Sequence, residues 1–147
     1  MEIARWLHIS GVVVWVGGMF FAHMALRPAA LALPPPQRLP LLAAALTRFI
    51  AWVAPAIVAI LASGFALVAW RGGFAALAPG VHAMVLLGIV MTLVYVYIVA
   101  APLRGLRAGV AAGDWPRAGA AMARIRGLVL VNLVLGFVTL TLAMLWR

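Results

Sequence analysis

Apolar residues in this chain run almost without interruption between widely spaced arginines. Residues 6–26, 49–70 and 127–146 form three segments that carry no formally charged side chain. A helix needs about 20 residues to cross a hydrocarbon layer of about 30 Å. None of the segments alternates between apolar and polar positions with a period of two, as strands would. Each segment therefore predicts a transmembrane helix, since a helix satisfies its own backbone hydrogen bonds in lipid.

A fourth crossing is predicted within the apolar stretch 72–103. Gly72-Gly73 and Pro79-Gly80 break the beginning of this stretch, and Pro102 follows its end. The sequence thus predicts an all-α integral membrane protein that forms a four-transmembrane-helix bundle in a single domain of residues 1–147. The expected spans are approximately 4–27, 46–70, 81–101 and 121–146.

The two long connections also carry local signals. Pro34-Pro35-Pro36, between the first two spans, indicates a stiff spacer. In the second connection, Asp114 is an expected N-cap and Pro116 falls in the first turn of a helix that starts at Trp115 and continues into the fourth span.

Composition excludes several classes of protein. The chain is 68% hydrophobic and 9% charged, with a mean hydropathy of +1.21, which excludes a soluble fold and leaves no length for a separate soluble domain. The absence of cysteine excludes disulfides, thiolate metal sites and covalently attached haem. The predicted spans contain no carboxylate or amine, which argues against a proton pump or an ion-coupled transporter.

The formal charge of +9 comes from arginines that lie at the ends of the spans. Such arginines anchor loops to anionic headgroups, so we expect the lipid bilayer as a partner and no binding to nucleic acid. Eight of them fall in the two long connections: Arg27, Arg38, Arg48, Arg104, Arg107, Arg117, Arg124 and Arg126. The positive-inside rule then predicts a multi-pass protein of the bacterial inner membrane with both termini outside, in the periplasm.

Two histidines occupy similar depths in the predicted bundle. His8 and His82 lie near the outer ends of parallel helices, whereas His23 lies about 22 Å deeper than His8 at 1.5 Å per residue. Imidazoles from two helices are typical axial ligands of a b-type haem. The favoured hypothesis is one haem b toward the outer face, with an electron-transfer or redox role and a possible redox partner protein.

Other residues near His8 fit this hypothesis. Gly11 and Trp15 share a helical stripe with His8, and the glycine leaves room for a flat ring or a close helix. Arg5 and Arg71 lie on the side where haem propionates would need cations. The alternatives are that Gly11 serves helix packing, that the arginines are interface anchors, and that His8 is a polar contact between helices.

Copper is the second chemistry that the sequence allows. Thioethers and imidazoles select Cu(I), and Met19, His23 and Met24 cluster at the inner end of the first span. At the outer end of the third span, His82 and Met84 could act together with His8. The alternative function is therefore a copper-handling membrane protein, while a third is a cofactor-free structural or assembly subunit in which methionines fill the core.

Several short segments resemble the four-helix membrane proteins of the copper-resistance protein D (CopD) family. The resemblance is carried by Arg5-Trp6-Leu7-His8, Val14-Trp15-Val16-Gly17-Gly18-Met19-Phe20, Leu26-Arg27-Pro28, Thr47-Arg48-Phe49, Ala62-Ser63-Gly64, Val81-His82-Ala83-Met84 and Ala101-Pro102-Leu103-Arg104. It implies copper uptake or copper resistance.

The same pattern is similar, more distantly, to the HemJ-type protoporphyrinogen oxidase, a four-helix membrane protein that binds haem b. That resemblance implies His8 as a haem ligand. It also places the His-x-Lys of that family on His82 and Met84, so methionine stands here in place of lysine. The resemblance leaves open whether the chain is an enzyme, and the sequence leaves a homo-oligomer possible.

The arginine distribution predicts the orientation in the membrane. A reporter fused after Arg147 should be periplasmic, and one inserted between Ala108 and Gly113 should be cytoplasmic, because most arginines lie in the two long connections. The reverse pattern of reporter activity would contradict this orientation, and every residue discussed above would then lie near the opposite membrane face.

Overall fold

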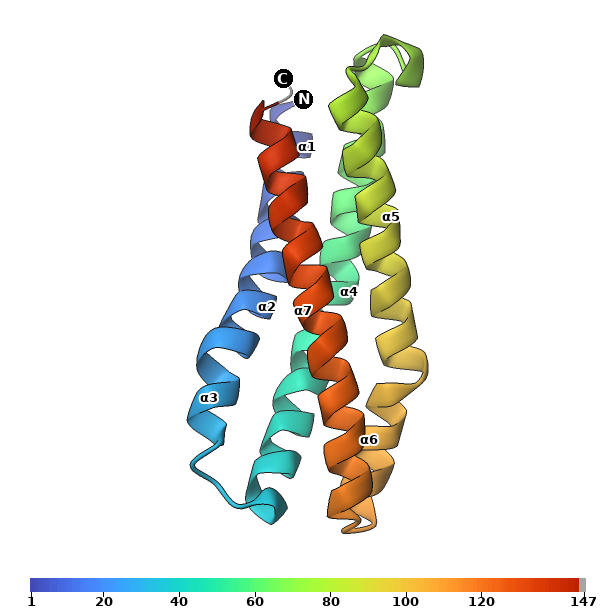
Figure 1. Cartoon of the computed structure of the whole chain (residues 1–147). Coiled ribbons are helices and arrows are strands. Elements are labelled where there is room, and N and C mark those ends of the chain that lie inside the picture. Colours follow the sequence, from blue (N-terminus) through green and yellow to red (C-terminus); the bar gives the residue numbers. More distant parts are fainter. Residues whose placement is uncertain (146–147) are drawn as a thin grey trace.

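The computed structural model describes residues 1–145, and these form an up-and-down bundle of helices (Figure 1). Four helical stretches are long and apolar enough to cross a membrane: Glu2–Ala30, Pro35–Trp70, Pro79–Ala111 and Trp115–Leu145. The predicted all-α four-span fold is confirmed. The expected end of the fourth span at residue 146, together with Arg147, lies outside the described residues.

The first crossing is a helix of mixed winding. It comprises α1 (Glu2–Val12), α2 (Gly18–Phe21) and α3 (Arg27–Ala30), joined by two π-helical segments, η1 (Val13–Gly17) and η2 (Ala22–Leu26). A π-helical turn contains more residues than an α-helical turn. Positions beyond Val12 are therefore rotated away from the faces that a regular period of 3.6 residues predicts.

The second crossing is α4 (Pro35–Trp70), and it begins well before the expected position near residue 46. The expectation of a stiff proline spacer was wrong for most of the motif. Pro34 is the extended N-cap, with ψ 155°, and Pro35 and Pro36 form the first turn of the helix. A proline fits there because backbone N–H groups of the first turn have no partner within the helix.

The second half of the chain follows the predicted pattern more closely. Gly72 and Gly73, with φ of 94° and 85°, separate α4 from a short 3-10 turn η3 (Phe74–Ala76) and from α5 (Pro79–Ala100). After α6 (Pro102–Ala111), Asp114 precedes α7 (Trp115–Leu145), and its Oδ1 accepts a hydrogen bond from the backbone N–H of Arg117 at 3.0 Å. The predicted N-cap is confirmed.

The bundle has two distinct ends. The beginning of α1, the turn between α4 and α5, and the end of α7 lie at one end, here called the terminal end (Figure 1). The α3–α4 and α6–α7 connections lie at the other, here called the loop end. The helix α1 packs mainly against α4, and α7 packs mainly against α5 and α6. The membrane face that each end touches stays a prediction.

The contact between α6 and α7 depends on Gly109. A β-carbon on this residue would lie 2.9 Å from the backbone nitrogen of Ala118, whereas one on Gly105 would lie 3.7 Å from the β-carbon of Ala121, an ordinary contact. We expect Gly109→Ala to lower the free energy of unfolding by about 1–3 kcal/mol through overpacking. Gly105→Ala should be neutral or stabilising, because alanine favours the helix.

Denaturant unfolding of the two variants in detergent, followed by circular dichroism, measures this difference. Equal stability of the two proteins would contradict the close α6–α7 packing.

Candidate functional site

His8 is fixed against α4 by its Nδ1 atom. This atom lies 3.0 Å from the carbonyl oxygen of Ile60 and 3.2 Å from Oγ of Ser63. A carbonyl oxygen only accepts, and the Ser63 hydroxyl donates to the carbonyl of Ala59, so Nδ1 must carry the hydrogen. In the neutral ring, Nε2 then keeps its lone pair and is available to a metal ion.

The glycines near His8 serve helix packing. A β-carbon on Gly11 would lie 2.7 Å from Cγ1 of Ile60, and one on Gly64 would lie 3.3 Å from Cε1 of His8. The sequence allowed either a flat ring or a close helix beside Gly11. In the structure this space is filled by the helix α4. Trp15, on the same predicted stripe, is buried in the hydrophobic core.

His82 has different surroundings. It is exposed near the start of α5, where its Nδ1 lies 3.3 Å from the Ala78 carbonyl oxygen and its ring centroid lies 5.9 Å from that of Phe74. His8 is turned toward α4 and His82 toward the turn that precedes α5. The two rings therefore contact different segments of the bundle.

The two arginines proposed for haem propionates lie at the terminal end, Arg5 on α1 and Arg71 directly after α4. Arg5 is exposed and forms an ion pair with Glu2 at 3.1 Å. Arg71 is exposed and is the C-cap residue of α4. Contact of either arginine with a propionate stays a prediction.

The residues of the expected Met19, His23 and Met24 cluster are differently buried. Met19 is 2% exposed and belongs to the core, whereas Met24 is 54% exposed. His23 and, on α5, Met84 are half-buried. Among residues 1–145, no three histidine or acidic side chains lie together in a way that could hold a metal ion. Thioethers and single imidazoles are the soft ligands that this part of the chain offers.

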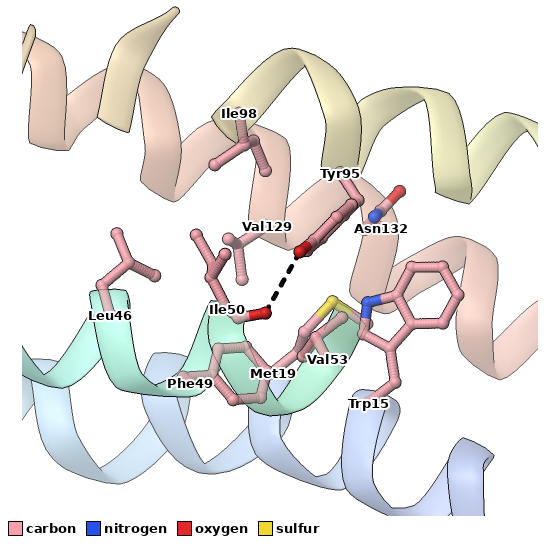
Figure 2. A pocket seen from close by; sticks show the side chains of 10 residues that line it. All are labelled: Trp15, Met19, Leu46, Phe49, Ile50, Val53, Tyr95, Ile98, Val129 and Asn132. Carbon is pink, nitrogen blue, oxygen red and sulfur yellow. Dashed lines mark hydrogen bonds between the residues drawn. The ribbon is translucent and has the colours of Figure 1, made fainter. Parts of the chain in front are cut away.

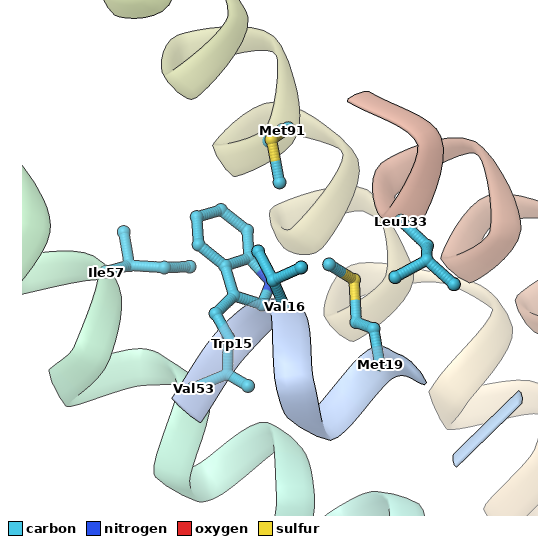
Figure 3. Packing of buried hydrophobic residues seen from close by; sticks show 7 residues of the cluster. All are labelled: Trp15, Val16, Met19, Val53, Ile57, Met91 and Leu133. Carbon is cyan, nitrogen blue, oxygen red and sulfur yellow. The ribbon is translucent and has the colours of Figure 1, made fainter. Parts of the chain in front are cut away.

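Sequence reasoning missed a second core methionine. Met91, on α5, is 4% exposed and belongs to the same buried cluster as Met19, Trp15 and Val16. Figure 3 shows the two thioether side chains extending from different helices toward Trp15 and Val16. The available signal was the spacing of seven residues between Met84 and Met91, which puts both on similar sides of a helix.

Polar groups from α5 and α7 reach this core. Asn132 is 2% exposed and its Nδ2 donates to the carbonyl of Met91 at 3.1 Å, while its Oδ1 has no partner within residues 1–145. The Tyr95 hydroxyl donates to the carbonyl of Ile50 at 3.1 Å. Figure 2 shows these side chains around a cavity of about 20 Å³, which Trp15 and Met19 also line.

The fold and these neutral buried groups define a multi-pass membrane protein with a core that contains amide, phenol, indole and thioether groups. Residues 43–146 match the sequence model of the copper resistance protein D (CopD) family. The match covers more than half of the chain, so the protein belongs to this family, as predicted. No curated protein and no solved structure matches the chain.

The match divides the candidate residues into two groups. It includes His82, Met84, Met91 and Asn132, and it begins in α4, after His8 and the rest of the first crossing. The comparisons give no support to the more distant HemJ-type resemblance.

The Asn132 amide should contribute measurably to stability. Asn132→Ala removes an interhelical hydrogen bond and leaves a small cavity, so we expect the free energy of unfolding to fall by about 1–3 kcal/mol. Thr139→Ala is the matched control on α7, because the Thr139 hydroxyl donates to the Leu135 carbonyl of its own helix. Denaturant unfolding in detergent compares them, and equal losses would contradict a special role for the Asn132–Met91 bond.

Proposed function

We propose that this protein handles copper in the bacterial inner membrane by binding Cu(I) inside its bundle and passing it on. Membership of a family named for copper resistance supports this function. The ligand chemistry agrees, because a chain without cysteine must bind a soft cation through thioethers and imidazoles.

The observation that carries the proposal is the burial of Met19 and Met91 in one cluster at the centre of the bundle. Thioethers are neutral and polarisable, so they replace water around Cu(I) and add no second charge to the apolar interior. The same region contains Asn132, whose Oδ1 lacks a partner within residues 1–145. A buried polar atom of this kind requires an explanation, and a transient cation nearby supplies one.

His8 provides a ligand closer to the terminal end. Its Nδ1 is held by α4, so its free Nε2 can bind copper without first losing a proton. Met19 follows His8 by eleven residues, at most about 16 Å along the helix because Val13–Gly17 is π-helical. In this proposal, Cu(I) binds first at His8, near one face of the membrane, and then at Met19 and Met91, near its middle. His82 and Met84 offer an additional position at the same end.

The proposal predicts the Cu(I) affinity of specific variants. Met19→Leu and Met91→Leu keep nearly the same volume but remove the sulfur, so each should weaken Cu(I) binding by about tenfold or more, the loss expected for one good ligand. Met122→Leu is the control, because Met122 packs against a different buried cluster. Competition of the full-length protein in detergent with a chromogenic Cu(I) chelator, under anaerobic reducing conditions, measures the affinities.

Three results would contradict the proposal. The first is unchanged affinity in both core variants, and the second is the failure of the unmodified protein to retain Cu(I). The third is a Soret band in protein from haem-replete cells that disappears in His8→Ala. That band would favour haem b, which the family match does not support.

A further inference from the structure

A second cavity lies at the loop end, between the beginning of α4 and the first turns of α7. Its volume is about 140 Å³, far larger than that of the core cavity. Three arginines from different helices line it: Arg27 on α3, Arg38 on α4 and Arg126 on α7. Segments far apart in the sequence thus bring three arginines to one cavity.

Within residues 1–145, none of the three arginines forms an ion pair. The chain has only two acidic residues, Glu2 and Asp114. Glu2 pairs with Arg5 at the terminal end, and Asp114 accepts the backbone N–H of Arg117. Within residues 1–145, the hydrogen bond of the Arg38 side chain is a long one of 3.5 Å, from Nη1 to the carbonyl oxygen of Leu33.

The remaining lining is apolar and lies at the boundary of the membrane-spanning segments. Leu39 and Leu42 are buried on one side, and Met122 and Leu31 complete the apolar part. Arg27 falls near the end of the first membrane-spanning stretch, Glu2–Ala30. The cavity therefore combines cations with a hydrocarbon-compatible surface at the depth where lipid headgroups meet acyl chains.

We infer that this cavity binds the phosphate group of an anionic phospholipid. Guanidinium groups bind phosphate oxygens through paired hydrogen bonds, and basic pockets between membrane helices are typical of anionic lipid headgroups. The apolar residues favour a lipid phosphodiester over free phosphate, because they would contact its glycerol and first methylene groups. The inference rests on the cavity and its charges, independently of the copper proposal.

The experiment uses the delipidated full-length chain in a neutral detergent. Phosphatidylglycerol should bind and raise the unfolding temperature, whereas zwitterionic phosphatidylcholine and inorganic phosphate should have little effect. In the double variant Arg38→Gln/Arg126→Gln, phosphatidylglycerol should bind at least about tenfold more weakly, because charge-assisted hydrogen bonds are lost. Native mass spectrometry measures the bound lipid, and thermal unfolding without lipid shows that the variant is folded.

The matched control is Arg48→Gln/Arg124→Gln. It makes the same change of charge on α4 and α7 at two exposed arginines outside the cavity lining. This control should keep the affinity of the unmodified chain. If both double variants lost the same affinity for phosphatidylglycerol, the loss would come from the lower net charge, and the proposed site would be wrong. Inorganic phosphate that stabilises the chain as strongly as phosphatidylglycerol would overturn the lipid assignment. If the cavity variant does not fold, Arg38→Lys/Arg126→Lys must bind the lipid more weakly than the control does.

Discussion

Hydrogen bonds from a side chain of one helix to a main-chain carbonyl of the next hold this bundle in register. His8 donates to Ile60, Tyr95 to Ile50 and Asn132 to Met91, which ties α1 to α4, α5 to α4 and α7 to α5. Lipid tails are as apolar as leucine, so burial alone does not drive membrane helices together. Each such bond contributes about 0.6 kcal/mol on average, and up to about 1.7. Close packing at Gly11 and Gly109 adds to these bonds.

The same bonds prepare the groups to which we assign chemistry. The bond to Ile60 puts the proton of the His8 ring on Nδ1 and leaves Nε2 for a ligand. The bond from Asn132 fixes its amide beside the buried methionines and leaves Oδ1 without a partner in the described part of the chain. Because every one of these groups is neutral, a soft cation bound there, as we propose, would bring no second charge into the core.

The sequence predicted what depends on hydropathy and local backbone preference. The four spans, the break at Gly72-Gly73 and the Asp114 cap follow from run length, glycine and capping chemistry. It did not predict the helical start at Pro35, since prolines tolerate both a spacer and a first turn. The π-helical segments and the placement of Met19 and Met91 in one buried cluster depend on packing between helices. The haem hypothesis relied on equal depth for His8 and His82, which does not determine where each ring points.

X-ray absorption at the copper edge tests the central claim most directly, because it reports the atoms bound to the metal. The full-length protein loaded with Cu(I) in detergent should show sulfur scatterers, and Met19→Leu/Met91→Leu should lose them. A copper spectrum with only nitrogen and oxygen neighbours, or one that the double variant leaves unchanged, would contradict the assignment of the buried thioethers as ligands.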